Sequence, residues 1–122
     1  MNSEVKEMLA TAGINAETLL ERSCGNESLA IRLLGMFLDD TNYEQLVTAM
    51  KEKNPDEALA ASHTLKGVSG NLAMDTLYER CSTQVKAMRA GDWETAEDMM
   101  DEIGILYRNA RAAVEKVLAA KK

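Results

Sequence analysis

One stretch of the sequence, AASHTLKGVSGNL at residues 60–72, decides the fold and contains the only histidine of the chain. Its small and apolar residues recur three and four positions apart, which is the spacing of a helix that buries one face. The predicted buried stripe consists of Ala58, Ala61, Leu65, Val68 and Leu72. At about 100° per residue, His63 falls opposite the centre of this stripe, so we expect its imidazole to face water.

Small residues surround His63 on its predicted face. Gly67 and Gly70 follow it by four and seven positions, and Lys66 places a cation one turn away. A glycine inside a helix costs about 1 kcal/mol relative to alanine, so two of them beside an exposed imidazole indicate that a large partner approaches it. A lone histidine or lysine on a solvated helix face is by itself an ordinary surface residue. The function therefore depends on the wider pattern.

The composition predicts one helical domain. With 122 residues, the chain is long enough for a hydrophobic core but too short for two ordinary domains, so we take residues 1–122 as a single domain. Aromatic residues make up only 4% of the chain, whereas Ala, Leu, Met and charged residues are abundant. This mixture is typical of helices rather than sheets.

Charge and hydropathy narrow the classes of partner. The formal net charge is −6 and no basic stripe is present, which argues against binding to nucleic acid. No apolar run approaches the roughly 18 residues that span a bilayer, and the N-terminus lacks a secretory signal pattern. We therefore expect a cytoplasmic protein with no membrane segment. An acidic bundle of this size can also exist as a monomer.

The two cysteines indicate neither a metal site nor a redox pair. Cys24 and Cys81 lie far apart and form no CxxC motif. We expect both thiols to be reduced, with Cys81 in the apolar stripe of its helix. The sequence therefore suggests no metal and no other cofactor.

Start and stop signals divide the chain into amphipathic helices. Asn54-Pro55 is the strongest start, because a capping residue precedes a proline at the first helical position. We expect short helices over 4–10 and from Asn15 to near residue 25, and longer ones over 28–53, from Pro55 to 71–73, over 75–90 and from Asp92 onward. The stripe of the 28–53 helix is interrupted at residues 39–42, where a kink or a solvated patch is expected.

These elements predict an all-α fold. Four amphipathic helices joined by short turns pack most simply as an antiparallel up-and-down four-helix bundle. The two short N-terminal helices would cover one end of that bundle.

The stretch from His63 to Leu72 resembles the signature of histidine-containing phosphotransfer (HPt) domains, in which a histidine is followed by leucine, Lys-Gly and small residues. Residues 33–40, 77–81 and 90–92 resemble further segments of the family, and roughly residues 15–118 follow its pattern without a large gap. Two positions depart from it. Ala73 stands where the family often has glycine, and Gln84 precedes Val85 where the family commonly has an apolar residue before a polar one.

The resemblance implies a phosphorelay intermediate. His63 would accept a phosphoryl group from an aspartyl phosphate on one receiver domain and pass it to an aspartate on another. An imidazole suits this role because it is a nucleophile near neutral pH. Lys66 would offset charge on the transferring group, while Gly67 and Gly70 would let the receiver approach. The implied partners are response-regulator receiver domains and, in some pathways, a hybrid sensor kinase.

Two further residues are candidates for partner binding. Leu59 lies one turn before His63 on the same predicted face, away from the buried stripe, and could anchor an apolar patch of the receiver. Gln84 is expected at the edge of the stripe of its helix. It could reach toward the neighbouring helix and the phosphate, but the pattern favours a boundary polar residue.

Other histidine chemistries fit the sequence less well. A di-iron bundle requires Glu-x-x-His pairs that face inward, but position 60 is alanine and the chain has one histidine. Positions 59, 60, 66 and 67 offer no carboxylate, serine or cysteine to orient the imidazole for hydrolysis, so only a residue from another helix could take that role. The sequence contains no phosphate loop and no nucleotide-binding motif, so we expect no intrinsic ATP-dependent kinase activity. The alternative that remains open is a non-catalytic helical adaptor that binds receivers or other signalling proteins.

Overall fold

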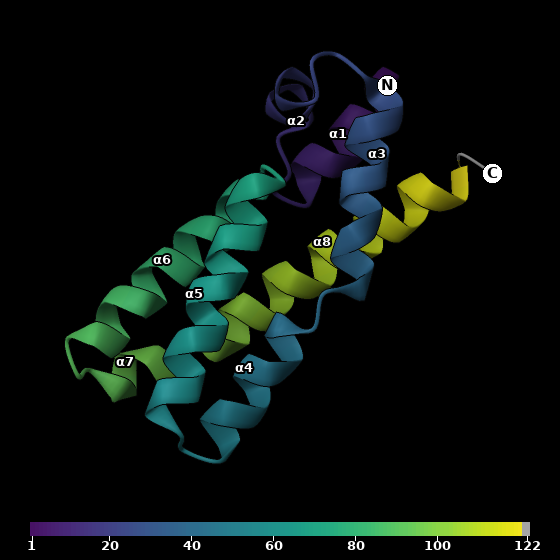
Figure 1. The fold of residues 1–122 in the computed structure, drawn as a ribbon. Helices are drawn as coiled ribbons and strands as arrows, with labels where there is room; N and C mark the ends of the chain where they lie inside the picture. The colour runs from purple at the N-terminus through teal and green to yellow at the C-terminus, as the bar shows by residue number, and fades with distance from the viewer. Residues whose placement is uncertain (121–122) are drawn as a thin grey trace.

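The computed structural model describes residues 1–120, which form helices joined by short turns (Figure 1). The last two residues of the predicted domain lie outside the described residues. The elements in chain order are α1 (Ser3–Thr11), α2 (Ala16–Arg22), α3 (Glu27–Met36), the 3-10 helix η1 (Phe37–Asp39), α4 (Asn42–Lys51), α5 (Pro55–Asn71), α6 (Asp75–Arg89), α7 (Trp93–Asp98) and α8 (Met100–Ala120).

The helices form the predicted all-α bundle. Helix α5 lies between α4 and α6, with which it makes its most extensive contacts, and α8 runs behind them (Figure 1). The two short helices α1 and α2 lie at the end of the bundle where α5 ends and α6 begins. This arrangement buries one face of α5 and leaves the opposite face open.

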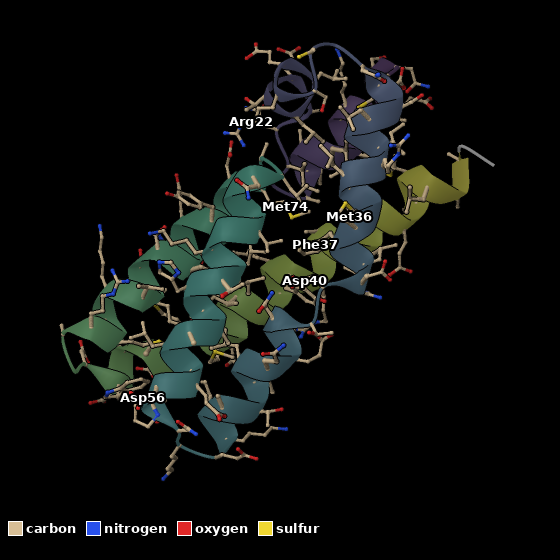
Figure 2. All side chains as sticks on the ribbon, in the orientation of Figure 1. Arg22, Met36, Phe37, Asp40, Asp56 and Met74 are labelled. Atoms are coloured by element: carbon tan, nitrogen blue, oxygen red, sulfur yellow. The ribbon has the colours of Figure 1, made fainter. Side chains whose placement is uncertain are left out.

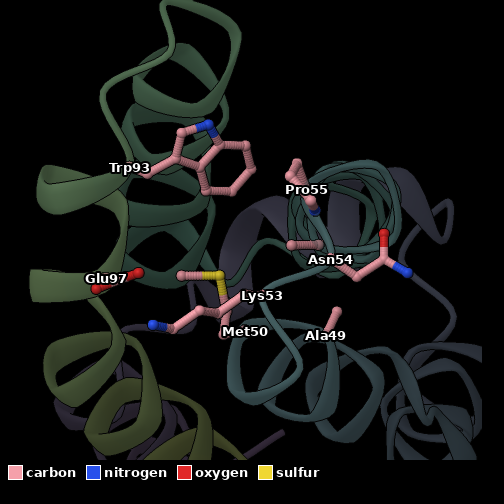
Figure 3. Close-up of a pocket in the computed structure, with 8 residues that line it drawn as sticks. Ala49, Met50, Lys53, Asn54, Pro55, Trp93 and Glu97 are labelled. Carbon is pink, nitrogen blue, oxygen red and sulfur yellow. The ribbon is translucent and has the colours of Figure 1, made fainter.

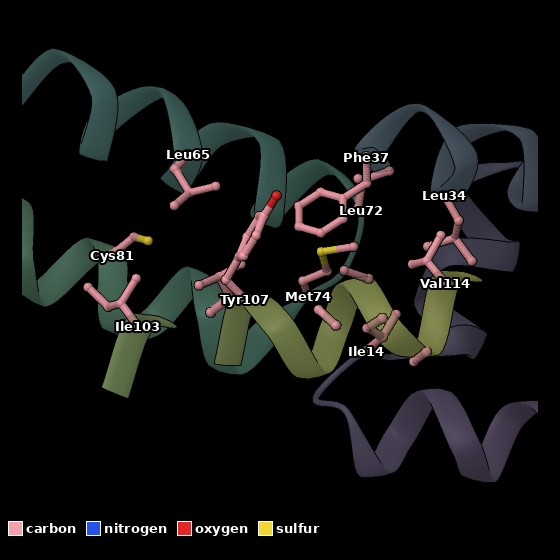
Figure 4. Packing of buried hydrophobic residues seen from close by; sticks show 14 of the residues in the cluster. Ile14, Leu34, Phe37, Leu65, Leu72, Met74, Cys81, Ile103, Tyr107 and Val114 are labelled. Carbon is pink, nitrogen blue, oxygen red and sulfur yellow. The ribbon is translucent and has the colours of Figure 1, made fainter. Parts of the chain in front are cut away.

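The core lies between α5, α6 and α8 and continues toward α3 (Figure 4). Full burial of one large apolar side chain contributes about 1.5–3 kcal/mol. The largest fully buried apolar side chains are Phe37, Leu9, Ile14, Leu19, Leu34, Leu46, Leu65, Met74, Leu77, Ile103 and Val85. Of the predicted α5 stripe, Ala58, Ala61, Leu65 and Leu72 are buried, whereas Val68 is half-buried.

The single helix predicted over 28–53 is wrong. The chain instead forms α3, η1 and α4, and α3 begins at Glu27 with Asn26 as its cap. At the break, the Asp40 carboxylate accepts hydrogen bonds from the Asn42 backbone N–H at 3.0 Å and from the Asn42 amide at 2.7 Å. Such local side-chain bonds compete with the helical ladder, so the interruption predicted at residues 39–42 becomes a helix boundary.

The final predicted helix is also divided. Asp92 caps it as expected, accepting from the Thr95 backbone N–H at 3.2 Å, but α7 ends before Met99 and α8 begins after it. Met99 keeps right-handed helical angles, φ −78° and ψ −13°. Backbone hydrogen bonds from Met99 N to Thr95 O, 3.1 Å, and from Ile103 N to Met99 O, 3.0 Å, connect the two helices.

Helix α5 begins and ends where the sequence predicts. The Asn54 side chain accepts from the Glu57 backbone N–H at 3.2 Å, and Pro55 occupies the first turn. After the helix, Ala73 adopts φ +57°, the left-handed region that favours glycine. Alanine is therefore less favourable at this position than the glycine that the resemblance implies.

The turn between α1 and α2 is attached to the turn between α5 and α6. Ile14 and Met74 form an isolated antiparallel bridge, and the Asn15 N–H donates a 2.8 Å hydrogen bond to the Ala73 carbonyl. Met74 lies at this junction (Figure 2). The N-terminal helices are therefore fixed directly to the end of the histidine-bearing helix.

Candidate functional site

His63 is exposed on the open face of α5, as the helical spacing predicts. The residues on either side of it in the sequence differ in burial, because Ser62 is fully buried and Thr64 is exposed. The imidazole therefore projects from a helix whose opposite face is held in the core.

A groove of about 610 Å³ lies beside His63. It is formed by α5, the start of α6 and the end of α2. The lining residues are Arg22, His63, Lys66, Gly67, Gly70, Asn71, Asp75 and Tyr78. Four residues predicted from the sequence thus share one surface, and the structure adds Arg22, Asn71, Asp75 and Tyr78 to it.

The two glycines of the groove have different surroundings. A Cβ at Gly67 would meet no atom within 4 Å, so this position is open to solvent. A Cβ at Gly70 would lie 2.9 Å from Cδ2 of Tyr78. The prediction that both glycines provide clearance for a partner therefore needs correction, because the space beside Gly70 is already taken by the Tyr78 ring.

Tyr78 also positions the predicted cation. The Lys66 ammonium lies 5.9 Å from the centre of the Tyr78 ring, within the range of a cation–π interaction. Lys66 is half-buried, and 40% of the Tyr78 surface remains exposed. Tyr78 lies on α6, so a motif confined to the histidine helix gave no signal that could have identified it.

Gln84 does not lie at this surface, which contradicts its assignment as a partner-binding residue. Its side chain is fully buried. Oε1 accepts a 2.8 Å hydrogen bond from Ser62, and Nε2 donates to the Ala96 carbonyl at 2.9 Å. An amide needs partners when it is buried, and these contacts supply them. Gln84 joins α6 to α5 and α7 inside the bundle.

Leu59 is less exposed than predicted. It is half-buried and packs against the core, so the expectation that it lies away from the buried stripe is wrong. The buried face of α5 is wider than a narrow three-four stripe, since Ser62 and Ser69 are also buried. A partner could still touch the exposed part of Leu59.

Arg22 reaches the groove from α2. Its guanidinium donates a hydrogen bond from Nη1 to the carbonyl of Gly70, in the last turn of α5. Figure 2 shows Arg22 at the end of the bundle where α5 and α6 meet. Its 48-residue separation from Gly70 explains why a motif confined to one helix did not reveal it.

A second hollow, of about 220 Å³, lies at the beginning of α5 and contains none of the predicted site residues (Figure 3). It is lined by Ala49, Met50, Lys53, Asn54, Pro55, Ala58, Trp93 and Glu97.

Among residues 1–120, no group of three or more His, Cys, Asp or Glu side chains is placed to hold a metal ion. None of the helices in that range is long and apolar enough to cross a membrane.

Comparison with protein-family models shows the family of this helical bundle. The family model of the Hpt domain matches residues 32–118, so the chain belongs to the Hpt domain family. Hpt domains have a phosphotransfer role in two-component signalling and generally interact with receiver domains. The match includes α4 to α7 and most of α8, but begins after α1 and α2. No curated protein and no solved structure matches the chain.

Proposed function

We propose that this protein is a phosphorelay intermediate in which His63 carries the phosphoryl group. An imidazole nitrogen attacks the phosphorus of an aspartyl phosphate on a receiver domain. The nitrogen–phosphorus bond forms, the bond from phosphorus to the aspartate oxygen breaks, and the aspartate leaves as a carboxylate. Transfer to the aspartate of a second receiver reverses these changes. The observation that carries the proposal is the exposed His63 on an open helix face of an Hpt domain.

Lys66 and Gly67 support this chemistry from the same groove. The Lys66 ammonium offsets negative charge on the transferring phosphoryl group, and its contact with Tyr78 restricts where the ammonium can lie. The open space at Gly67 lets the receiver backbone approach the imidazole. A larger side chain there would occupy the surface that the receiver must contact.

The partners in this proposal are response-regulator receiver domains, one of which a hybrid sensor kinase can supply. The chain acts as a single monomeric domain in the cytoplasm and takes its phosphoryl group from a receiver rather than from ATP. Because the groove contains His63 and Lys66 but no nucleotide motif precedes them in the sequence, a protein donor accounts best for phosphorylation.

Incubation with a phosphorylated receiver tests the proposal. We expect the wild-type protein to acquire a phosphate that is labile to acid and stable to alkali, and His63→Gln to acquire none. Circular dichroism of His63→Gln should show an unchanged bundle, because the side chain is exposed. Receiver binding without any labelling would instead establish the non-catalytic adaptor.

A further inference from the structure

Arg22 belongs to the surface around His63 although α2 lies outside the family match at residues 32–118. It lines the same groove as His63 and Lys66, and it is exposed. Gly70, to which it donates, follows His63 by seven residues. Two helical turns correspond to about 10 Å, so the guanidinium lies beside the phosphoryl group's position rather than on it.

The attachment of α2 fixes the place of this guanidinium. The bridge between Ile14 and Met74 and the 2.8 Å hydrogen bond from Asn15 N to Ala73 O connect the start of α2 to the end of α5. Arg22 ends the same short helix, and Nη1 is held by the Gly70 carbonyl. A partner that binds here does not need to order the arginine first, which lowers the entropic cost of association.

The remaining donors of Arg22 are suited to a carboxylate. A guanidinium has five N–H donors and accepts no hydrogen bond, and a planar carboxylate is its best-matched partner. Within residues 1–120, Arg22 forms no ion pair at 4.0 Å or less. The groove carries Arg22 and Lys66 against a single carboxylate, Asp75, although the whole chain has a net charge of −6. A local excess of positive charge therefore faces the partner.

We propose that Arg22 is a partner-binding residue that pairs with a carboxylate on the receiver surface. The inference rests on the proposed function, which places a receiver over His63. The receiver's phosphoryl-bearing aspartate must lie at the imidazole, so the carboxylate that pairs with Arg22 is a second acidic residue, about 10 Å away. Arg22 therefore governs receiver affinity and selectivity, and it does not contribute to the chemical step.

Two substitutions separate this role from that of a structural cap. Arg22→Lys keeps the charge, whereas Arg22→Gln removes it and keeps an N–H donor for the Gly70 carbonyl. The matched control is Arg89→Gln, which makes the same change in net charge at an exposed position in the last turn of α6, outside the groove. Each variant is titrated with the unphosphorylated receiver that binds wild type most tightly, and its phosphotransfer kinetics are then measured with the phosphorylated form.

We expect Arg22→Gln to raise Kd and KM about fivefold at about 50 mM NaCl, with kcat changed less than twofold. The Kd and KM of Arg22→Lys should lie closer to the wild-type values, and those of Arg89→Gln should equal them. At about 500 mM NaCl the difference between Arg22→Gln and wild type should shrink, because salt screens exposed charges.

Equal Kd values for Arg22→Gln and wild type would overturn the proposal, whatever the change in thermal stability. If wild type binds the receiver but takes no label at His63, the phosphorelay function fails, while the Kd comparison still decides the role of Arg22. If wild type binds no receiver at all, both proposals fail.

Discussion

The hydroxyl of Ser62 donates a 2.8 Å hydrogen bond to Oε1 of Gln84, so the residue next to the exposed His63 is anchored in the core. The Gln84 amide nitrogen continues the connection to the Ala96 carbonyl, at 2.9 Å, and to the sulfur of Met100, at 3.1 Å. Three elements, α5, α6 and the α7–α8 segment, are thereby joined by one side chain. The helix that carries His63 is therefore held from its buried side.

Replacement of Gln84 should therefore affect stability and not partner recognition. We expect Gln84→Ala to lower the free energy of unfolding by about 2–3 kcal/mol, because it creates a cavity and leaves the Ser62 hydroxyl and the Ala96 carbonyl unpartnered. Ser62→Ala should cost about 1 kcal/mol. Urea denaturation of both variants and of the double variant measures these values.

The double variant supplies the control for this pair. Because the two side chains contact each other, its loss should be smaller than the sum of the single losses. At a temperature where all variants are folded, the KM for the receiver should match that of wild type. An increased KM with unchanged stability would show instead that Gln84 contacts the partner.

The fold could be predicted where local signals were strong. Asn54-Pro55 identified the start of α5, and the helical spacing placed His63 on its exposed face. The break at Asp40 was harder to place, since a few side-chain hydrogen bonds decided between a kink and a new helix. The sequence pattern showed the interruption, but not that the Asp40 carboxylate would bind both the backbone N–H and the side-chain amide of Asn42.

The site was predictable only in the part that one helix contributes. His63, Lys66 and Gly67 share the groove because helical periodicity fixes their relative positions. Arg22 and Tyr78 come from other helices, so their approach depends on packing that a single sequence does not reveal. Gln84 was misassigned because a polar residue beside an apolar stripe can lie at its edge or inside, and only its hydrogen-bond partners distinguish the two.

The two thiols should differ sharply in reactivity. Burial raises the pKa of Cys81 to about 12, so its thiol stays neutral at pH 8, whereas Cys24 is exposed. Because the thiolate is the reactive form, an aromatic disulfide reagent should modify one thiol of the native protein and both in denaturant. Cys24→Ser should react only after unfolding. Rapid modification of two native thiols would show that Cys81 is accessible.

The two glycines of the groove should respond differently to alanine. Gly67→Ala should raise the free energy of unfolding by about 1 kcal/mol, because alanine favours the helix and its Cβ meets open space. Gly70→Ala should raise the free energy of unfolding by less, because its Cβ would lie 2.9 Å from the Tyr78 ring. Urea denaturation distinguishes the two variants.

A Tyr78→Ala background provides the control for Gly70. When the ring is absent, Gly70→Ala should raise the free energy of unfolding by as much as Gly67→Ala does. In wild-type background, Gly67→Ala should still slow transfer from the receiver despite its greater stability, because the added methyl group stands on the face of His63. If Gly67→Ala and Gly70→Ala raised the free energy of unfolding equally in the wild-type background, this result would contradict the close contact between position 70 and Tyr78.

Leu59 should contribute to both stability and docking. Since it is half-buried against the core, we expect Leu59→Ala to lower the free energy of unfolding by about 1 kcal/mol, rather than to leave it unchanged. Its exposed part lies one turn from His63, so the KM for the receiver should also rise. Denaturation and phosphotransfer kinetics measure the two effects separately.

Val68→Ala is the matched comparison for Leu59, because Val68 is also half-buried on α5 and packs against the core. At about 100° per residue, Val68 lies about 140° around the helix from His63, whereas Leu59 lies about 40° from it. Both variants should lose comparable stability, since both remove methyl groups from partly buried positions. Only Leu59→Ala should raise KM if the leucine docks the receiver. The same KM for both variants would mean that Leu59 acts only as part of the core, and the receiver would then recognise this face through the polar groove around His63 alone.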